Sequence, residues 1–261
     1  MQQQIISKLT EELLEAEAKL VPVEPLSTRY PELSVKDSYD IQLQWVERKL
    51  EEGRVIIGKK VGLTSKAMQD MLGVDEPDYG HLLDNMKVSS GTELSRKDFI
   101  KPKVEAEIGF ILKEDLCGPN VTYVDVLMAT EALVPTLEII DSRIEDWKIR
   151  LVDTVADNGS SARAVIGEPF YDLEKIDLRT LSMTLIKNGG ISATGTGAAA
   201  LGHPAYAIAW LANKLADYNI SLKAGELILP GALSAAIDVD SGDEITAAFG
   251  KLGSVTISFR E

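Results

Sequence analysis

Two glutamates alternate with apolar residues in the segment Lys103-Val-Glu-Ala-Glu-Ile-Gly-Phe-Ile-Leu112. In a β-strand, successive side chains point to opposite faces, so Glu105 and Glu107 would project together. Water or a cation relieves the repulsion between such carboxylates, and their oxygens on a rigid backbone suit Mg²⁺ or Mn²⁺. The pair alone also fits an ordinary solvated strand face, so a metal site needs a further ligand.

A third glutamate, Glu138, interrupts the apolar run Ala132-Leu-Val-Pro-Thr-Leu-Glu-Ile-Ile140. This run is apolar enough to be buried on both faces, and a buried carboxylate needs a compensating charge. Arg143 is one candidate partner, and a metal ion shared with Glu105 and Glu107 is the other. Three carboxylates leave coordination positions open, where a 2-oxo acid could bind while the cation stabilises an enolate. These residues therefore predict a metal-dependent enzyme that acts on a small 2-oxo acid.

Lys60 and Asp78 are the candidate catalytic residues besides the three glutamates. Lys60 follows an apolar strand and precedes Gly62, so its ammonium could lie near the metal and pair with a substrate carboxylate or with enolate charge. A surface ion pair is the alternative for this lysine. Asp78 lies in Glu76-Pro-Asp-Tyr-Gly80, and this pattern favours a turn in which the aspartate bonds to nearby backbone.

The two histidines are first interpreted as structural residues. His81 is expected to hydrogen-bond within a local turn, with proton transfer near neutral pH as the alternative. His203 precedes Pro204 and is expected to cap the helix that follows. The adjacent Asp157 and Asn158 are expected to order a loop at the site through hydrogen bonds to the backbone.

The composition permits a folded enzyme and argues against some partners. The chain has 261 residues, 45% of them hydrophobic, which is enough to bury a substantial core. Its 41 acidic and 27 basic residues give a formal charge of -14, a field that repels nucleic acid and anionic membrane surfaces. An anionic substrate would therefore need a local positive feature, such as a metal ion or well-placed lysines.

Cysteine usage and the N-terminal residues indicate the compartment. The lone cysteine, Cys117, excludes an internal disulfide and a cysteine-based zinc cluster, which fits a reducing environment. Glutamates interrupt the first 20 residues, where a secretory signal would have an apolar core. No apolar run reaches the roughly 20 residues that span a bilayer. We therefore expect a cytoplasmic protein without a membrane segment.

The apolar pattern divides the chain into a helical beginning and a β-rich remainder. Apolar residues recur at helical spacing over residues 5–14, 35–50 and 205–218. Short apolar runs punctuated by glycine predict strands over residues 55–57, 104–112, 134–140, 226–229, 244–249 and 254–259. Asn188-Gly189 between alternating flanks predicts a hairpin turn. We expect an α+β fold, with a helical N-terminal segment (residues 1–55) packed on a β-rich catalytic domain (residues 56–261).

Several longer motifs occur in order along almost the whole chain. They are Gly58-Lys-Lys-Val-Gly-Leu-Thr-Ser65, Glu76-Pro-Asp-Tyr-Gly-His-Leu-Leu83, Val104-Glu-Ala-Glu-Ile108, Glu138-Ile-Ile-Asp-Ser-Arg143, Asp153-Thr-Val-Ala-Asp-Asn158 and Leu201-Gly-His-Pro204. With these motifs the sequence resembles the 2-oxopent-4-enoate (2-hydroxypenta-2,4-dienoate) hydratase and 4-oxalocrotonate decarboxylase family, within the fumarylacetoacetate hydrolase-like superfamily. The resemblance implies a lyase of bacterial meta-cleavage pathways for aromatic compounds, with a fumarylacetoacetate hydrolase-like core.

The same resemblance implies roles for individual residues. The positions that match the family's ligands for Mg²⁺ or Mn²⁺ are Glu105, Glu107 and Glu138. The matching catalytic positions are Lys60 and Asp78. The matching substrate-binding positions are Leu63, Ser160 and Ser161, with the two serines competing for one placement. The resemblance also implies a homo-oligomer and association with a sister decarboxylase or hydratase.

Two reactions fit this resemblance. A hydratase would convert 2-hydroxypenta-2,4-dienoate to 4-hydroxy-2-oxopentanoate with Asp78 as the base, and a decarboxylase would release CO₂ from 2-oxohex-3-enedioate. The motif around Asp78 resembles hydratases, whereas residues 158–163 and 232–237 resemble decarboxylases, and Arg163 could receive a second substrate carboxylate. We favour the hydratase because the acid/base position changes the available chemistry. A metal-stabilised partner subunit without turnover is the non-enzymatic alternative.

Overall fold

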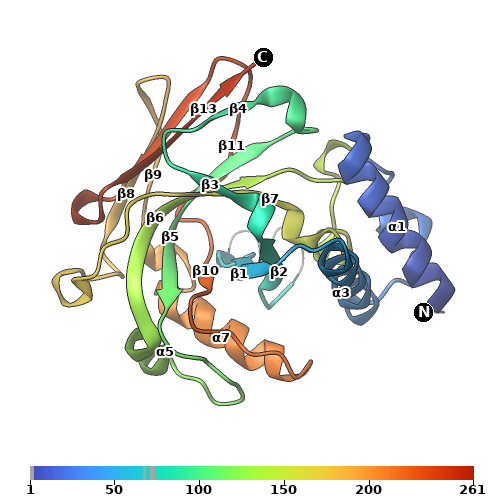
Figure 1. The fold of residues 1–261 in the computed structure, drawn as a ribbon, viewed down its shortest axis with the longest axis horizontal. Helices are drawn as coiled ribbons and strands as arrows, with labels where there is room; N and C mark the ends of the chain where they lie inside the picture. The colour runs from blue at the N-terminus through green and yellow to red at the C-terminus, as the bar shows by residue number, and fades with distance from the viewer. Residues whose placement is uncertain (1–2, 67–68, 71–73) are drawn as a thin grey trace.

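The N-terminal region of the chain is helical. The computed structural model describes residues 3–66, 69–70 and 74–261. Its first elements are α1 (Gln3–Lys19), α2 (Leu26–Arg29) and α3 (Val35–Glu51). Helices α1 and α3 lie side by side at one side of the molecule (Figure 1). The apolar stripe of α1 faces inward, since Ile6, Leu9 and Leu13 are buried.

Local chemistry sets the beginning of α3. Ser34 Oγ accepts a hydrogen bond from Asp37 N (3.1 Å), and the Asp37 carboxylate accepts one from Ser34 N (3.1 Å). This capping box satisfies amides that the first turn of a helix leaves unpaired. The helices predicted over residues 5–14 and 35–50 are confirmed.

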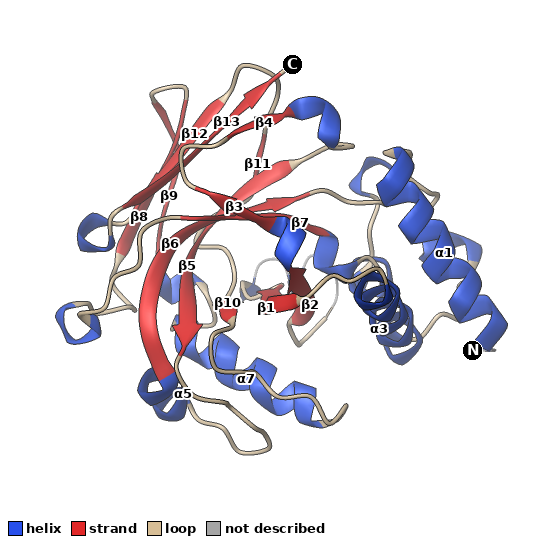
Figure 2. Cartoon of the chain, in the orientation of Figure 1, coloured by secondary structure: helices blue, strands red, loops and turns tan. Residues whose placement is uncertain are grey.

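A curled sheet forms the centre of the molecule (Figure 2). Its strand order is β2-β1-β10-β5-β6-β7-β3, with β11 paired to β5. The strands are β1 (Ile56–Gly62), β2 (Asp78–Leu83), β3 (Lys87–Ser89), β5 (Lys103–Leu112), β6 (Thr130–Ile140), β7 (Ser161–Ile166), β10 (Leu227–Leu229) and β11 (Ile237–Asp238). The curl brings β2 into contact with β7, which is far from it in this order.

A second sheet lies against β6 and β7. Its strand order is β4-β13-β12-β8-β9. The strands are β4 (Glu93–Ser95), β8 (Ser182–Lys187), β9 (Gly190–Thr196), β12 (Glu244–Ala248) and β13 (Ser254–Arg260). Asn188 (φ 53°) and Gly189 (φ 78°) join β8 to β9, so the predicted hairpin turn is confirmed.

Three further α-helices come later in the chain. They are α5 (Tyr123–Ala129), α6 (Leu151–Ala156) and α7 (Pro204–Ala216). His203 Nδ1 accepts a hydrogen bond from Ala205 N (3.1 Å), which confirms the predicted cap of α7. Helices α5 and α7 pack together below the curled sheet (Figure 1).

The two faces of β5 have different surroundings. Val104, Ala106 and Ile108 are fully buried on one face and belong to the main apolar cluster, which includes residues of the second sheet. Side-chain alternation therefore directs Glu105 and Glu107 to the other face, inside the curl. The core thus holds the two glutamates on a rigid strand.

One local prediction was wrong. The turn expected at Glu76-Pro-Asp-Tyr-Gly80 is not where Asp78 lies, because Asp78 is the first residue of β2 and pairs with Gly62. Antiparallel pairing with β1 overrides the local preference for a turn. The α+β fold class is confirmed, and the division of the chain at residues 55 and 56 stays a prediction.

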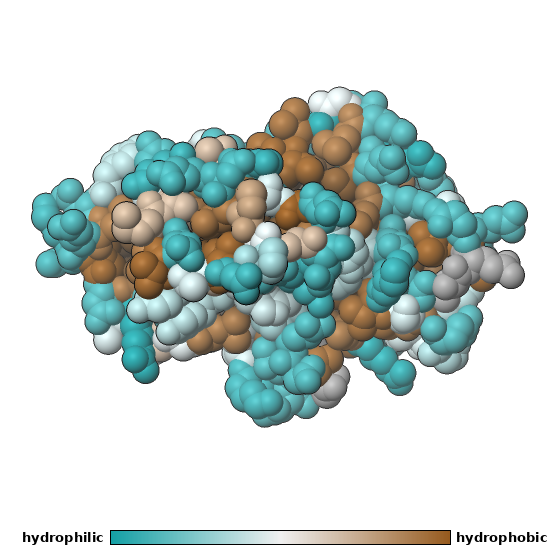
Figure 3. Space-filling model, turned by 90° about the horizontal axis from the view of Figure 1, so that it is seen from below, coloured by the Kyte–Doolittle hydropathy of each residue, from teal (hydrophilic) through white to brown (hydrophobic). Residues whose placement is uncertain are grey.

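The face seen in Figure 3 is largely polar, with scattered apolar areas. Large apolar side chains with substantial exposure include Val124 and Met128 on α5 and Tyr206 on α7. Within the described part of the chain, none of the helices combines the length and the apolar character that crossing a membrane requires.

Candidate metal centre

Three glutamates from two neighbouring strands converge inside the curl of the sheet. In the antiparallel pairing of β5 with β6, Glu105 lies directly opposite Glu138. Glu107 lies two residues further on the same face of β5. One carboxylate oxygen from each of the three lies within 4.8 Å of the others. Like charges directly opposite one another destabilise a sheet, so this arrangement calls for a cation.

The glutamate oxygens are left largely without protein partners. Glu107 Oε2 accepts a hydrogen bond from Gly231 N (2.7 Å). Among the described residues, Glu107 Oε1 and both oxygens of Glu138 have no hydrogen-bond partner, although both side chains are buried. Buried polar atoms without partners are rare and costly. Free carboxylate oxygens at this spacing fit the ligand set that a hard divalent cation prefers.

Burial also changes the protonation of the glutamates. Loss of hydration raises the pKa of Glu105 to about 7, and Lys60 acts in the opposite direction. The pKa of Glu107 is raised well above its usual value by burial and by its glutamate neighbours. Burial likewise raises the pKa of Glu138. Without a cation, the cluster therefore resists carrying its full negative charge.

Lys60 supplies an ammonium group to this cluster. Its Nζ lies 3.6 Å from Glu138 Oε2 and donates a hydrogen bond to Gly159 O (3.0 Å). Burial acts to lower the pKa of Lys60, but Glu138, Asp78 and the other carboxylates outweigh it and the pKa is raised. The surface ion pair considered for Lys60 is excluded because its side chain is buried.

Arg143 does not serve as the partner of Glu138. Its Nε lies 2.6 Å from Asp157 Oδ1, in a buried ion pair. That alternative for Glu138 is therefore wrong, and Glu138 pairs with Lys60 instead. A single ammonium leaves three converging carboxylates unbalanced, which a divalent cation would correct.

Asp78 is buried at the edge of the cluster. Its Oδ2 accepts a hydrogen bond from Thr154 Oγ1 (3.3 Å), and Oδ1 has no hydrogen-bond partner among the described residues. Burial raises the pKa of Asp78, while Lys60 opposes the shift. A Cβ on Gly62 would lie 2.1 Å from Asp78 Oδ1 and 3.2 Å from Lys60 Nζ. Both groups thus lie over Gly62, which has to lack a side chain.

Ser160 and Ser161, the two candidates for one substrate-binding position, have different surroundings. Ser160 Oγ donates a hydrogen bond to Asp157 Oδ2 (2.9 Å). Ser161 Oγ is buried without a hydrogen-bond partner among the described residues, and the hydroxyl acts to lower the pKa of Glu138. Leu63 follows β1 in the left-handed conformation (φ 56°), and its carbonyl accepts a hydrogen bond from Gln69 Nε2 (2.9 Å). Of the two hydroxyls, that of Ser161 is the one beside Glu138, whereas that of Ser160 is bonded to Asp157.

Arg163 lies away from the cluster. It pairs in register with Ile139, next to Glu138, so its side chain takes the opposite face of the sheet. Its guanidinium carbon lies 5.5 Å from the centre of the Phe99 ring. The suggestion that Arg163 receives a second substrate carboxylate therefore has no support in its position.

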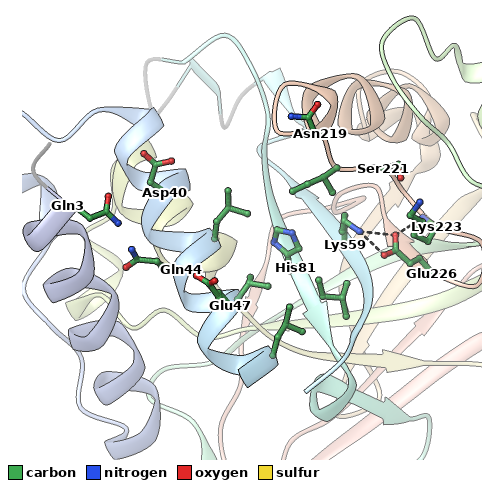
Figure 4. A pocket seen from close by; sticks show the side chains of 15 residues that line it. Gln3, Asp40, Gln44, Glu47, Lys59, His81, Asn219, Ser221, Lys223 and Glu226 are labelled. Carbon is green, nitrogen blue, oxygen red and sulfur yellow. Dashed lines mark hydrogen bonds and ion pairs between the residues drawn. The ribbon is translucent and has the colours of Figure 1, made fainter. Parts of the chain in front are cut away.

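The neighbouring Lys59 faces a separate hollow of about 830 Å³ on the other side of β1 (Figure 4). Its Nζ donates to both oxygens of Glu226, at 2.7 and 2.9 Å. His81 also lines this hollow, and its Nδ1 lies 3.2 Å from Gln42 Oε1. Burial lowers the pKa of His81 to about 3, so the ring is neutral. The role in a local turn predicted for His81 is therefore wrong, because the residue lies within β2 and bonds to α3.

Thr154 and Gly231 were not anticipated from the sequence. Thr154 lies on α6, and Gly231 follows β10. Only folding brings Thr154 to Asp78 and Gly231 to Glu107. The motif that contains Thr154 indicated that its region is important, but it did not predict the hydrogen bond from Thr154 to Asp78. For Gly231 the donor is a backbone amide, which leaves no mark in the residue type.

Comparison with known proteins now places the chain. Residues 57–260 match the family model described as Fumarylacetoacetate (FAA) hydrolase C-terminal. The chain belongs to the fumarylacetoacetate hydrolase family. Within this family, the 2-hydroxyhexa-2,4-dienoate hydratase of Comamonas testosteroni is 44% identical over 260 residues, or 99% of this chain and 98% of the relative. The 2-hydroxypent-2,4-dienoate hydratase of Pseudomonas putida is 47% identical over 222 residues, or 85% of this chain and 100% of the relative.

A solved structure of the fumarylacetoacetate hydrolase family extends the likeness to three dimensions. The 4-oxalocrotonate decarboxylase from Pseudomonas putida G7, complexed with magnesium and adipate, superposes with a TM-score of 0.96 at 39% identity. The match covers 99% of this chain and 98% of that protein. Hydratases and a decarboxylase thus resemble the chain to similar degrees, which confirms the expected family and a lyase type of activity.

Proposed function

We propose that this chain is a divalent-metal-dependent hydratase that converts 2-hydroxypenta-2,4-dienoate to 4-hydroxy-2-oxopentanoate in the meta-cleavage degradation of aromatic compounds. In this proposal, Glu105, Glu107 and Glu138 hold Mg²⁺ or Mn²⁺. The observation that carries it is the convergence of three carboxylates within 4.8 Å around unpartnered buried oxygens. The magnesium complex of the structurally similar decarboxylase supports the choice of metal.

The glutamates and their neighbours would bind and orient the substrate. Bound there, the cation supplies positive charge and open coordination positions for the carboxylate and ketone oxygens of a 2-oxo acid. Lys60 places an ammonium beside Glu138 and would balance the negative charge that the substrate brings. Ser161, whose hydroxyl lies beside Glu138, is our candidate donor to the substrate carboxylate, and Leu63 is our candidate contact beside it.

Asp78 is our candidate for the acid and base. Burial raises its pKa, so the carboxyl accepts a proton more readily than an exposed aspartate would. It would take the proton of the 2-hydroxyl group while a proton is added at C5, which yields an enone. Water then bonds to C4 through its oxygen, and a proton is delivered to C3. The substrate and one water molecule together account for all atoms of the product.

Two observations favour the hydratase over decarboxylation of 2-oxohex-3-enedioate. A buried carboxyl with a raised pKa stands beside Lys60, where hydration needs an acid and base and decarboxylation does not. Arg163, the cation suggested for a second substrate carboxylate, is directed to Phe99 on the other face of the sheet. Decarboxylase remains the second candidate because of the structural likeness.

A paired assay tests this proposal. Purified protein with Mg²⁺ or Mn²⁺ is supplied with 2-hydroxypenta-2,4-dienoate and, separately, with 2-oxohex-3-enedioate, and both the loss of conjugation and the release of CO₂ are followed. We expect hydration of the first compound and no CO₂ from the second. CO₂ release without hydration would assign decarboxylation instead. No turnover of either compound, together with no binding of oxalate to the Mn²⁺-loaded protein, would leave the partner-subunit alternative.

We also propose that the protein acts as a homo-oligomer in the cytoplasm and associates with a sister enzyme of its pathway. Exposed apolar side chains such as Val124, Met128 and Tyr206 are candidates for contacts between copies. Light scattering of the purified protein tests the oligomer, and co-purification with the sister decarboxylase tests the association. A monodisperse monomer at micromolar concentration would contradict the first part.

A further inference from the structure

Three successive residues before β7 adopt the left-handed conformation. Asn158, Gly159 and Ser160 have φ values of 53°, 60° and 54°. Residues other than glycine avoid this region because Cβ crowds the following carbonyl, so a run of three persists only where the surroundings impose it. Strained backbone of this kind concentrates at functional sites, and here the turn adjoins Lys60.

The side chain of Asn158 ties the turn to β2. Its Oδ1 accepts a hydrogen bond from His81 N (2.7 Å), and its Nδ2 donates one to His81 O (2.9 Å). The carboxamide therefore pairs with the strand as another strand would. The backbone approaches equally closely, since a Cβ on Gly80 would lie 2.4 Å from Asn158 O. These contacts fix one end of the turn.

Asp157 and Arg143 hold the rest of the turn. The Asp157 carboxylate forms the ion pair with Arg143 and accepts hydrogen bonds from the hydroxyls of Ser160 (2.9 Å) and Ser142 (3.2 Å). Arg143 in turn donates to the backbone carbonyls of Asp157 and Ser161, the latter at 3.0 Å. The ion pair therefore holds the turn in two ways: Asp157 bonds to the Ser160 side chain, and Arg143 bonds to backbone carbonyls of the turn.

The turn delivers two groups to the glutamate cluster. Gly159 O accepts a hydrogen bond from Lys60 Nζ (3.0 Å), and a Cβ on Gly159 would lie 3.1 Å from the same nitrogen. Ser161, at the end of the turn, has its hydroxyl beside Glu138, whose pKa it acts to lower. A shift of the turn would therefore move both the ammonium and the hydroxyl relative to the carboxylates.

We propose that the Arg143–Asp157 ion pair is a positioning device that fixes Lys60 and Ser161 for substrate binding and reaction. This inference rests on the proposed function in one respect, the roles of Lys60 and Ser161 in binding the substrate. The pair forms no hydrogen bond or ion pair with the three glutamates, and it acts through the left-handed turn. Positions held to within a fraction of an ångström matter for catalysis because a small misplacement of a reacting group lowers the rate strongly.

The same strand offers a matched control. Lys59 and Glu226 form another buried ion pair, with Nζ to oxygen distances of 2.7 and 2.9 Å, and Lys59 is the immediate neighbour of Lys60. Lys59 faces the hollow on the other side of β1, where it pairs with Glu226 (Figure 4). Disrupting either pair removes a buried charge interaction, but only one of the two should affect the site.

The test compares Arg143→Lys and Asp157→Asn with Glu226→Gln. Arg143→Lys keeps the charge but loses the forked donors, and Ser142→Ala removes one hydrogen bond to Asp157 if stronger changes prevent folding. We expect both variants of the positioning pair to lower kcat by about 10- to 100-fold with a smaller change in KM. Their Mn²⁺ affinity should stay within about threefold, and oxalate should bind the Mn²⁺-loaded variants more weakly. Glu226→Gln should lose stability while kcat stays within about twofold.

A crystal structure of Arg143→Lys separates this inference from the proposed function, because its geometry does not depend on activity. We expect Lys60 Nζ to move away from Gly159 O and the turn to shift. An unchanged turn in that structure, or a kcat loss no greater than in Glu226→Gln, would overturn the inference. A wild-type protein without hydratase activity would overturn the proposed function alone, and the structure and the oxalate affinity would still decide the positioning role.

Discussion

Burial determines the protonation behaviour of the acidic side chains at the site. Glu107, Glu138 and Asp78 are buried, and burial is the largest cause of their raised pKa values. Among the described residues, Lys60 is the ammonium that forms an ion pair with this cluster, through Glu138. The site therefore favours both the binding of a divalent cation and the transfer of protons near neutral pH.

Asp78→Asn tests the acid and base. The substitution keeps the size of the side chain and removes its ability to take and return a proton. We expect the hydration rate to fall by about 100-fold or more, while Mn²⁺ affinity changes by less than about threefold. Stopped-flow absorbance and Mn²⁺ titration measure the two quantities. An unchanged hydration rate would remove Asp78 from the mechanism.

Glu107→Gln tests the metal site. The change removes one charged ligand, so we expect Mn²⁺ affinity to fall by at least about tenfold and activity to fall with it. The metal-free variant should be more stable than the metal-free wild type, because one of the mutually repelling carboxylates is gone. Glu131→Gln is a matched control, since Glu131 is exposed on β6. Full metal affinity in Glu107→Gln would argue for other ligands.

The pairing of β5 with β6 is the element on which the site depends. Hydrogen bonding along both strands sets Glu105 opposite Glu138, while the opposite face of β5 is anchored in the apolar core. Repulsion between these carboxylates destabilises the pairing of β5 with β6, and the other contacts of the two strands have to offset it. A cation bound at this point removes that cost and should stabilise the two strands together.

The pH dependence of the metal-free protein follows from this arrangement. Burial raises the pKa of Glu105 from 4.5 to about 7, so the folded state binds the proton more tightly than the unfolded state. The contribution to stability is complete below pH 4.5 and is lost as the pH rises through about 7, with a size of up to about 3 kcal/mol. We expect the Tm of EDTA-treated protein to fall by several degrees between pH 5 and pH 8.

Saturating Mn²⁺ should reduce this fall, because the bound cation favours the ionised carboxylates. Differential scanning calorimetry at both pH values, with and without metal, measures the effect. Glu105→Gln provides the control, since the variant lacks the titrating group and should show a smaller dependence on pH. A metal-free Tm that rises from pH 5 to pH 8 in the wild type but not in Glu105→Gln would contradict the prediction.

At the scale of the whole molecule, Gln42 on α3 links the N-terminal helices to the elements that carry the site. This buried side chain of α3 donates to Tyr79 O (2.9 Å) and Val155 O (2.7 Å), and its Oε1 lies beside His81 Nδ1. One residue thus connects α3 with β2, which carries Asp78, and with α6, which precedes the left-handed turn. The N-terminal helices therefore brace the site without contributing a group to it.

Gln42→Leu tests this connection. The substitution leaves two buried carbonyl groups and one ring nitrogen without partners, so we expect a loss of about 3 kcal/mol in the free energy of unfolding. Gln44→Leu is the control, because Gln44 on the same helix is only partly buried and should cost less than about 1 kcal/mol. Urea denaturation measures both. Equal losses in the two variants would show that Gln42 has no special part in joining the helices to the sheet.

The sequence by itself determined the elements whose signals are local. Periodic apolar residues predicted α1 and α3, Asn188-Gly189 predicted the turn between β8 and β9, and His203 predicted the cap of α7. Alternation along one strand was enough to place Glu105 and Glu107 on a common face. In each case the interacting residues lie within a few positions of one another, so short-range sterics and hydrogen bonding decide the outcome.

Only the tertiary structure decided the partners. Asp78 starts a strand instead of a turn, Arg143 pairs with Asp157 instead of Glu138, and Lys59 and Lys60 face opposite sides of the sheet. Each of these outcomes depends on strand pairing and on the curl that brings β2 to β7, between segments far apart in the chain. Residue type sets which charges are present, but the energy of a buried charge depends on which atoms surround it, and that is known only once the chain has folded.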